Sequence, residues 1–465
     1  QAAFGLRDRH AFKSEFPGGP FGNAVRAASQ VLAARSGVAV VRISGKAALP
    51  CLRALTGKQD WVPNQMKYSS VVSRRSSLGS TDDLRSTIDE ALCVYFAAPK
   101  SFTGEDVAEL HVHGSLAVIR ELLGALERFP DLRPAERGEF TRRAFFNGKM
   151  DMLEVEGLAD LIDAETPMQK SQALRQMQGG MSGFYERLRK EVITTLAHLE
   201  AYIDFPDEEI PESVLSGLDA EVRGVMQTIA ATLSKHADGE RIREGISIVI
   251  LGAPNAGKSS LLNALAKRDA AIVSHHAGTT RDLVEVHLDI AGYPVILIDT
   301  AGLRESDNEI EREGIRRAKE RAANADIKLV LFDGTTDPDA ETLALLDAHS
   351  IVIATKSDLP CTMHHAPCTI FVSTKTGEGV DALLNLLETR ITERFSGEGA
   401  LITRSRHRGL LEQSHRHLER FFTVRELELK CEELRLAAHL IGKITGKIAV
   451  DDVLDVVFST FCIGK

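Results

Sequence analysis

The segment ISIVILGAPNAGKSS, residues 246–260, places a lysine and a serine directly after a glycine-rich turn. Its apolar run ends at Gly252, and Gly257, Lys258 and Ser259 follow at the spacing GxxxxGKS. In such a loop the backbone N–H groups face the α- and β-phosphates of a nucleotide, the lysine reaches the β- and γ-phosphates, and the serine hydroxyl ligates Mg²⁺. The spacing therefore predicts a phosphate-binding loop between a buried strand and a helix.

Four further motifs follow in the order that a guanine-nucleotide switch requires. A threonine hydroxyl of the first motif can complete the Mg²⁺ shell while the γ-phosphate is present, and Asp299 of the second can hold Mg²⁺ through water. Asp358 of the third can accept hydrogen bonds from guanine N1–H and the exocyclic amine, which adenine does not offer. The motifs are Gly278-Thr279-Thr280-Arg281-Asp282, Asp299-Thr300-Ala301-Gly302, Thr355-Lys356-Ser357-Asp358 and Ser373-Thr374-Lys375.

Backbone groups complete the predicted contacts to the nucleotide. The Gly302 N–H is expected to touch the γ-phosphate, and the backbone of residues 373–375 is expected to contact the guanine oxygen. Thr355 stands where GTPases usually carry the Asn of Asn-Lys-x-Asp. Because that Asn connects the base-binding loop to the phosphate loop, we expect a weaker connection here, with guanine recognition by Asp358 retained.

The residue that orients the attacking water is not evident from these motifs. Leu303 follows Gly302, where small GTPases carry a glutamine, and no arginine finger is apparent. Asn255, together with carbonyls of residues 274–279, could hold a monovalent cation where such a finger would reach. A carboxylate within 305–313 could orient water, although a solvated helix face is the more common role for any single one of these acids.

Alternating apolar strands and helical segments are expected to position these motifs between residues 246 and about 392. The AGY turn at 291–293 predicts an antiparallel hairpin of the second and third strands. The other strands should be parallel, with right-handed crossovers. The predicted strands are ISIVILG, LVEVHLDI, PVILIDT, IKLVLFDGT, SIVIATKSD and TIFVSTK.

A smaller α/β unit is predicted upstream, ending near Asn147. Its strands are expected at GVAVVRIS from Gly37, at Ala91–Ala97 and at Val107–His113, and its helices at 47–55 and 116–127. His111 and His113 alternate on a strand, and we interpret them as structural side chains rather than metal ligands.

Helical periodicity covers residues 151–243 and the tail from Arg406. One stretch is expected to stop at Pro206, and another to run from Val214 to Arg243. Because the apolar stripes of the tail need a surface to bury them, we expect one helical domain interrupted by the nucleotide-binding insertion. The stripes are Val155, Leu158 and Ile162; Leu188, Val192, Leu196, Leu199 and Ile203; Leu434, Ala437, Ile441 and Ile444; and Leu454, Val457 and Phe461.

Length and charge limit the classes of protein that fit. At 465 residues the chain should hold about three domains. The net charge of −10 and pI near 5.9 argue against a protein held broadly on phosphate backbones. Contact with nucleic acid is therefore expected at a local patch or through a partner. No apolar run approaches the ~18 residues that span a bilayer, so no membrane association is expected.

The six cysteines form no CxxC pair, which favours reduced thiols over a disulfide framework or a zinc site. A reducing compartment follows, and the cytoplasm is favoured. Residues 1–36 lack an initiator Met and clear periodicity, so a transit-peptide remnant, a vector-derived addition and a disordered segment all stay open. The first of these would place the protein in a mitochondrial or plastid matrix.

Residues 37–465 closely resemble the tRNA-modification GTPase family, whose members act with a flavoprotein partner on the wobble uridine of certain tRNAs. Besides the GTPase motifs, the resemblance rests on SFTGEDVAELHVHG, GEFTRRAFFNGKMDMLEVEGLADLIDAET, IDFPDEE and the terminal FCIGK. Residues 1–36 depart from it: AVRAASQVLAA stands where the family begins its first strand with a segment like DTIxA. This departure puts the first strand and its dimer contacts in doubt.

The resemblance implies a multidomain α/β and α protein. Residues 24–147 would form an α/β domain that binds tetrahydrofolate and dimerises. Residues 148–243 and 396–465 would form a discontinuous helical domain ending in CIGK, and residues 244–395 an inserted Ras-like P-loop GTPase domain. The folate, a one-carbon donor, would contact Arg42, Glu109, Lys149 and Lys465. A glutamate and cations suit a pterin ring and a polyglutamate tail, although without the family they are ordinary surface charges.

For the GTPase domain, the resemblance implies Mg²⁺ at Ser259 and Thr280, and catalytic roles for Lys258 and for Glu311, which would orient water. It implies K⁺ at Asn255, Ser274, His276 and Thr279. Cys462 would belong to the modification site, or else be a buried structural thiol. The GTP-binding residues implied are Asn255, Ala256, Gly257, Lys258, Ser259, Ser260, Ser274, His275, His276, Ala277, Gly278, Thr279, Thr280, Asp299, Thr300, Ala301, Gly302, Thr355, Lys356, Ser357, Asp358, Ser373, Thr374 and Lys375.

Together these features predict a K⁺-activated GTPase that works as a homodimer on tRNA. A partner, joined in a heterotetramer, would supply FAD and NADH chemistry, because this chain has no dinucleotide GxGxxG. The product would carry an aminomethyl or carboxymethylaminomethyl group at C5 of the wobble uridine. One alternative is a ribosome-assembly or RNA-binding GTPase switch, which should carry a basic KH-like tail instead of an amphipathic one. A folate enzyme merely regulated by GTP is the other.

Overall fold

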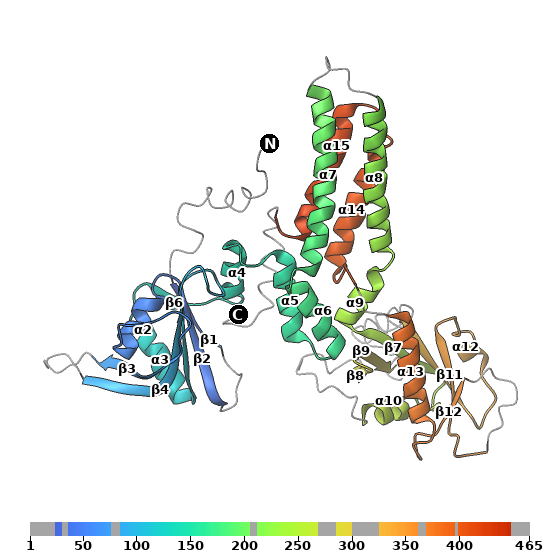
Figure 1. Cartoon of the computed structure of the whole chain (residues 1–465). Helices are drawn as coiled ribbons and strands as arrows, with labels where there is room; N and C mark the ends of the chain where they lie inside the picture. The colour runs from blue at the N-terminus through green and yellow to red at the C-terminus, as the bar shows by residue number, and fades with distance from the viewer. Residues whose placement is uncertain are drawn as a thin grey trace, which may run out of the picture. The chain divides into compact units, whose positions relative to one another are not determined.

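The computed structural model describes residues 24–29, 36–75, 84–204, 212–267, 285–299, 325–360, 369–395 and 399–447. The chain forms two compact units, an N-terminal unit of residues 1–159 with 445–465 and a second unit of residues 160–444. Figure 1 shows the helices and strands of each unit.

The N-terminal unit is built on a six-stranded sheet in the order β3-β4-β5-β2-β1-β6. Neighbouring strands are antiparallel, except β1 and β6, which are parallel. The strands are β1 (Ala24–Ser29), β2 (Ser36–Ser44), β3 (Lys67–Arg75), β4 (Leu84–Phe96), β5 (Val107–Gly114) and β6 (Leu132–Pro134). The predicted strands correspond to β2, to part of β4 and to β5, whereas β1, β3 and β6 were not predicted.

One face of this sheet is buried under two helices, as the strand alternation requires. Val41 and Leu110 point to this face and pack in one cluster with Leu52 of α2 (Ala48–Thr56) and Leu122 of α3 (Leu116–Leu126). Both helices were predicted from periodicity. Alternate residues on the opposite face include polar side chains, so that face is available for polar chemistry.

Two shorter helices complete the N-terminal unit. Helix α4 (Glu139–Phe146) follows β6, and α5 (Met152–Asp163) begins at the end of the unit. The Met152 N–H donates to the Thr445 carbonyl at 3.2 Å, so residues far apart in the sequence meet at the start of α5.

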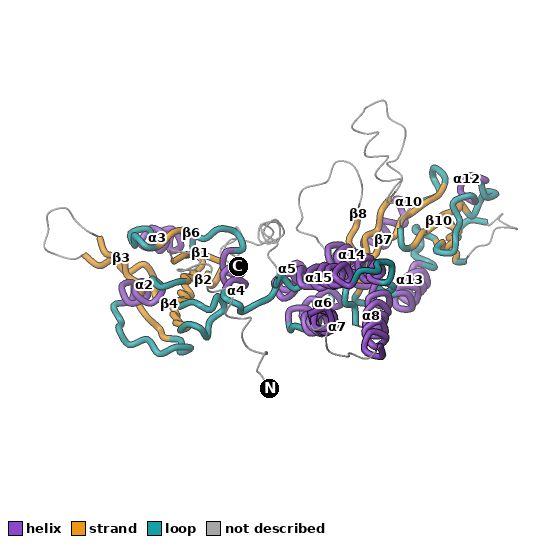
Figure 2. Tube along the Cα trace, turned by 90° about the horizontal axis from the view of Figure 1, so that it is seen from above, coloured by secondary structure: helices purple, strands orange, loops and turns teal. Residues whose placement is uncertain are grey.

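In the second unit, helices from both sides of the nucleotide-binding segment pack together. Helix α7 (Gly180–Asp204) contacts α15 (Leu427–Ile444), and α8 (Glu212–Leu233) contacts α14 (Ser405–Phe421). The four helices run alongside one another in Figure 1, and Figure 2 views them nearly along their axes. The predicted stripe of Leu434, Ala437, Ile441 and Ile444 is fully buried. The described tail helices are therefore part of the helical bundle.

The stretch predicted as one helix from Val214 to Arg243 is two helices. Helix α8 ends at Leu233, and α9 begins at His236 and ends at Glu244. The Lys235 N–H bonds to the Thr232 carbonyl, an i→i−3 bond that tightens the last turn and ends α8. The break turns the chain toward the nucleotide-binding sheet. A further helix, α6 (Pro167–Met177), lies between α5 and α7 in the sequence.

The second unit also contains a six-stranded sheet in the order β12-β11-β10-β7-β9-β8. Its strands are β7 (Ile246–Gly252), β8 (Glu285–Ile290), β9 (Tyr293–Asp299), β10 (Ile327–Asp333), β11 (Ser350–Thr355) and β12 (Ile370–Val372). The hairpin β8–β9 is antiparallel and the other pairs are parallel, which confirms the predicted arrangement.

Helices cover the apolar side chains of this second sheet. Ile250 and Leu329 pack with α10 (Lys258–Ala266) and α13 (Val380–Arg394) in one core, and a short helix, α12 (Ala340–Leu343), follows β10. Because β7, β9, β10, β11 and β12 run in the same direction, their carboxyl ends lie at one edge of the sheet, where ligands of open α/β sheets bind.

Cys51, Cys93 and Cys431 are buried side chains of the described residues. Within the described ranges, none of the helices has the length and apolar character needed to cross a membrane.

The bundle makes a quantitative prediction for two leucines of α15. Replacing fully buried Leu434 with alanine should lower the local opening free energy of the bundle by about 2–5 kcal/mol, because a cavity replaces the side chain. Leu429 is 51% exposed, so Leu429→Ala should change it by less than about 0.5 kcal/mol. Native-state amide hydrogen exchange in α7 and α15 measures both effects. Equal effects of the two substitutions would contradict this packing.

Candidate nucleotide-binding site

The phosphate loop leaves the sheet at the carboxyl end of β7 and enters α10. Gly252 has φ 148°, Asn255 has φ 65° and Gly257 has φ 91°. A Cβ on Gly252 would lie 2.4 Å from the Leu331 carbonyl oxygen of the neighbouring strand. Glycine is therefore required at Gly252 both by conformation and by space. The predicted glycine turn between a strand and a helix is confirmed.

Lys258 lies across this loop and is almost completely buried. Its Nζ donates to the carbonyls of Gly252 and Ala253, each at 2.8 Å. The ammonium group is thus held over the loop whose backbone N–H groups precede α10. A fixed positive charge beside a helix N-terminus suits the oxygens of a nucleotide's phosphates.

Ser259 and Asp299 meet at the same edge of the sheet. The Ser259 hydroxyl donates to Asp299 Oδ2 at 2.7 Å, although 40 residues separate the two in the sequence. Asp299 is buried at the end of β9, and Ser259 lies in the first turn of α10. A hydroxyl and a carboxylate are the hard oxygen ligands that Mg²⁺ prefers, so this pair fits the metal role predicted for it.

Thr355 connects the predicted base-binding loop to the phosphate loop. Its buried hydroxyl donates to the Ala256 carbonyl at 2.8 Å and also lies 3.0 Å from the Phe332 carbonyl oxygen. We expected a weaker connection from threonine than from asparagine. The structure shows that a connection exists and that it consists of one hydroxyl, which has a single proton to share between two acceptors.

The remaining base-recognition residues lie beside Thr355. Lys356 has φ 59° and pairs with Asp333 at the end of β10. Ser373 donates its hydroxyl hydrogen bond to Asp358 Oδ1 at 2.8 Å, which joins the third and fourth predicted motifs. Ser357 is half-buried and Lys375 is exposed. The sheet therefore brings the phosphate loop, Asp299 and these two motifs to one edge.

Several predicted residues lie outside the described residues. For the nucleotide and its cations they are Ser274, His275, His276, Ala277, Gly278, Thr279, Thr280, Thr300, Ala301, Gly302 and Glu311. Cys462 and Lys465 of the tail also lie outside them.

Of the phosphate-loop residues, Asn255 and Ser260 are exposed and Ala256 is buried. Thr374 is partly exposed.

In the N-terminal unit, Arg42 and Glu109 lie side by side on neighbouring strands. Arg42 Nε is 2.7 Å from Glu109 Oε1, and Glu109 Oε2 is 3.3 Å from His111 Nε2. The Arg42 guanidinium carbon lies 5.8 Å from the ring centroid of Phe102 and 5.6 Å from that of Phe140. Two predicted folate contacts are thus brought together on the outer face of the sheet, flanked by rings that sequence reasoning did not identify.

Lys149 and His113 have partners other than Arg42 and Glu109. Lys149 Nζ donates to the Pro99 carbonyl at 3.2 Å, at the start of the loop that carries Phe102. His113 Nδ1 lies 2.8 Å from Asp89 Oδ1. No cluster of three potential metal ligands occurs among His, Cys, Asp and Glu side chains of the described residues.

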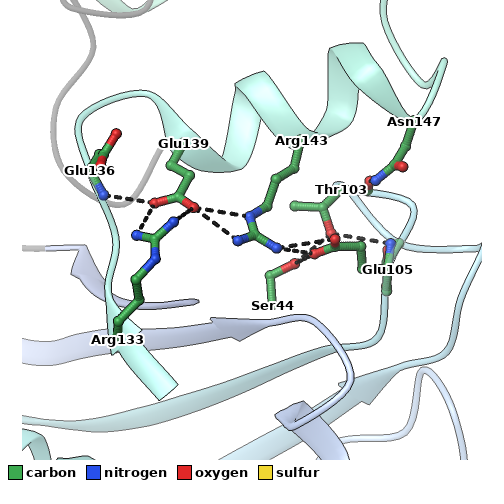
Figure 3. Close-up of polar contacts among 9 residues, drawn as sticks. Ser44, Thr103, Glu105, Arg133, Glu136, Glu139, Arg143 and Asn147 are labelled. Carbon is green, nitrogen blue, oxygen red and sulfur yellow. Dashed lines mark hydrogen bonds and ion pairs between the residues drawn. The ribbon is translucent and has the colours of Figure 1, made fainter. Parts of the chain in front are cut away.

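An ionic network joins the loop that carries Phe102 and Glu105 to helix α4 (Figure 3). Arg143, only 1% exposed, pairs with Glu139 at 2.9 Å and with Glu105 at 2.9 Å. Arg133 pairs with Glu139 at 2.6 Å, and the Ser44 hydroxyl donates to Glu105 at 2.8 Å. Because Phe102 and Phe140 are carried by the joined segments, the network places both rings around Arg42.

The protonation state of Glu139 follows from this network. Burial by itself would raise the pKa of the Glu139 carboxyl, but hydrogen bonds from Arg133, from the Glu136 N–H and from Arg143 lower it below its usual value. The carboxylate is therefore ionised at neutral pH, and the buried Arg143 has a charged partner. The i,i+4 pair of Glu139 and Arg143 was the only sequence signal of this network.

Comparison with known proteins identifies related sequences along almost the whole chain. The family model described as "GTP-binding protein TrmE N-terminus" matches residues 25–149, and the one described as "MnmE helical domain" matches residues 152–462. A curated "tRNA modification GTPase MnmE" of Paramagnetospirillum magneticum is 49% identical over 93% of this chain and 98% of its own length. Proteins of the same name from Rhodospirillum rubrum and Parvibaculum lavamentivorans are 48% and 46% identical over 93% of this chain, covering 97% and 98% of their own lengths.

The Thr355 hydroxyl predicts a measurable difference between two substitutions. Thr355→Val keeps the side-chain shape but removes the donor to the Ala256 carbonyl, so guanine-nucleotide affinity should fall about tenfold. Thr355→Ser keeps the hydroxyl and should bind within about twofold of the unaltered chain. Equilibrium titration with a fluorescent GDP measures both dissociation constants. Wild-type affinity in the valine variant would show that this hydroxyl does not support the phosphate loop.

Proposed function

Since the chain belongs to the MnmE family of tRNA modification GTPases and is a GTP hydrolase, we propose that it is a K⁺-activated GTPase that remodels the wobble uridine of certain tRNAs. The nucleotide part of this proposal rests on one observation: Lys258, Ser259 and Asp299 lie together beside the base-recognition loop. The tRNA part rests on the family, whose named relatives match this chain almost end to end.

Residues of the described site support a defined division of labour in GTP hydrolysis. The Lys258 ammonium would leave the Gly252 and Ala253 carbonyls and contact the β- and γ-phosphate oxygens. Ser259, with Thr280, would bind Mg²⁺, and Asp299 would hold it through water. Asp358, held by Ser373, would read guanine.

In the proposed mechanism a K⁺ ion takes the place of an arginine finger. K⁺ would be bound by Asn255, Ser274, His276 and Thr279, next to the phosphates, where it offsets the negative charge of the transition state. Asn255 supports this role because it is exposed and has a left-handed backbone conformation in the phosphate loop. Glu311 would orient the attacking water. Two GTPase domains meeting face to face would close the site.

The N-terminal unit is proposed to hold a tetrahydrofolate one-carbon donor and to form a homodimer. Arg42 and Glu109 lie together beside two aromatic rings, a set that suits the polar edge and the flat face of a pterin. Lys149 and Lys465 would meet the acidic tail of the folate. This arrangement supports a folate site, with the cofactor supplying the carbon added to the base.

A flavoprotein partner completes the proposed reaction. It would bring FAD and NADH in a heterotetramer, and C5 of the uridine would receive an aminomethyl or carboxymethylaminomethyl group. Cys462 is proposed to act at that site. The ribosome-assembly alternative needs an RNA-binding tail, but the described tail helices α14 and α15 are packed into the bundle. The six scattered cysteines, which form no CxxC pair, support action in the cytoplasm.

The proposal predicts that K⁺ accelerates both activities. With the flavoprotein partner, folate, NADH, GTP and unmodified tRNA, phosphate release and wobble-uridine modification should each be at least about tenfold faster in KCl than in NaCl, since a bound K⁺ lowers the barrier by about 1.4 kcal/mol or more. Phosphate assay and nucleoside mass spectrometry measure them. Equal rates in the two salts would remove the cation mechanism, and hydrolysis without modification would contradict the tRNA function.

A further inference from the structure

Helix α6 begins at a rigid point of the second unit. Thr166 Oγ1 accepts from the Gln169 N–H at 3.4 Å, while Gln169 Oε1 accepts from the Thr166 N–H at 3.1 Å. This reciprocal capping box, with Pro167 as the first helical residue, fixes the first turn of α6. Displacement of this turn therefore displaces the helix.

The first turn of α6 contacts the hairpin β8–β9. The Met168 N–H donates to the Gly292 carbonyl at 3.0 Å, and the Met168 side chain packs on the core of the GTPase sheet. Glu165 Oε2 lies 3.6 Å from His287 Nδ1 on β8. The hairpin turn is itself well defined, because the Gly292 N–H donates to Asp289 Oδ1 at 2.7 Å. Helix α6 is thus attached to the tip of the hairpin.

The same helix contacts α9 through a row of glutamines at helical spacing. Gln169 Nε2 donates to the Arg243 carbonyl at 3.1 Å, and Gln172 Nε2 donates to the Gly239 carbonyl at 3.0 Å. Gln176 Oε1 accepts from the Thr403 hydroxyl at 2.9 Å, just before α14. Figure 1 shows α6 beside α9 and next to β9. One face of α6 therefore connects the hairpin to helices on both sides of the GTPase segment.

An ion pair extends this connection into the bundle. Asp160 Oδ1 accepts from Arg243 Nε at 2.9 Å and from Arg404 Nη2 at 2.6 Å. Arg243 belongs to α9, and Arg404 is the N-cap residue of α14. A shift of the Arg243 backbone would therefore be felt at the start of α14.

The hairpin is placed to respond to the nucleotide. In the sequence it lies between the 278–282 motif and the 299–302 motif, and its far end carries Asp299, bonded to Ser259. Its two strands are paired from Ile290 and Tyr293 to Glu285 and Ile298. Such a paired hairpin moves as one piece, so a displacement at Asp299 reaches Gly292 at the opposite end.

We propose that α6 is the element that couples the nucleotide site to the helical bundle, with Met168 and Gln169 as its positioning residues. When the hairpin β8–β9 moves, Met168 moves with it. Gln169 then transmits this displacement through the Arg243 carbonyl to α9, and Arg243 transmits it through Asp160 to α14. The inference rests on the proposed function in one respect, namely that GDP and GTP alternate in the described site.

A single substitution can remove the hydrogen bond between α6 and α9 while α6 itself stays folded. Gln169→Glu keeps a carboxylate oxygen to accept from the Thr166 N–H, so the capping box is retained. It removes the Nε2 donor to the Arg243 carbonyl and places a negative charge there instead. Lys170→Ala changes an exposed side chain on the next residue of the same turn and serves as the matched control.

Amide hydrogen exchange of the full chain, with GDP and with a non-hydrolysable GTP analogue, tests the inference. In the unaltered chain and in Lys170→Ala, exchange should differ between the two nucleotides at β8–β9, at α6 and at residues 239–245. In Gln169→Glu the difference at β8–β9 should persist, whereas the difference at 239–245 should fall by at least about half. Met168→Ala, which acts at the other contact, should reduce the differences at both α6 and 239–245.

Two results would overturn the coupling role. One is an undiminished difference at 239–245 in Gln169→Glu and Met168→Ala. The other is the absence of any nucleotide-dependent difference at α6 in the unaltered chain, although the phosphate loop is protected by both nucleotides. Failure of the proposed function is distinguishable from these, because residues 246–260 would then show no protection by either nucleotide.

Discussion

The second unit depends on one constraint, the placing of three loops at the carboxyl edge of a mostly parallel sheet. Because β7, β9 and β11 run in the same direction, the phosphate loop, Asp299 and Thr355 are delivered to the same place. Two short hydrogen bonds then join them, Ser259 to Asp299 and Thr355 to the Ala256 carbonyl. A nucleotide site built in this way is preorganised by the sheet, so little ordering of these residues remains to be done on binding.

In the N-terminal unit, buried ion pairs position the side chains around Arg42, whereas in the second unit the edge of the sheet positions the site. Arg143 and Glu139 are both nearly inaccessible to water, and such groups are stable only when paired and hydrogen-bonded. The pairing requires α4 and the Glu105 loop to be in register, which also fixes the two rings around Arg42. Arg42 is therefore positioned by a network on its own side of the sheet, where Ser44 lies two residues along the same strand. Arg143 and Glu139 are its buried members, whereas the Glu105 and Arg133 side chains are 23% and 39% exposed.

The sequence predicted the elements whose signal is local. Most strands of the second sheet are apolar runs, and glycines adjoin β7, β9 and β10 at Gly245, Gly292 and Gly334. The GxxxxGKS spacing specified the loop after β7. Strands β1, β3 and β6 were not predicted, because AVRAAS is rich in alanine, KYSSVVSRR carries few apolar residues and LRP spans only three. The contacts of Phe102 and Phe140 with Arg42, and that of Arg143 with Glu105, were missed because these partners lie tens of residues apart in the sequence. The same holds for the link between α6 and α9.

Nucleotide chemistry at the phosphate loop is proposed to drive remodelling of a tRNA base. Nucleoside mass spectrometry of wobble uridine is the decisive test, in cells that lack their own family member and express this chain or a variant. The unaltered chain and Lys267→Ala, an exposed lysine at the end of the same helix α10, should restore the modified nucleoside. Lys258→Ala, expressed at equal level, should restore less than about a hundredth of it, because the phosphates lose their fixed cation. Full modification with Lys258→Ala would show that the phosphate loop does not drive the tRNA reaction.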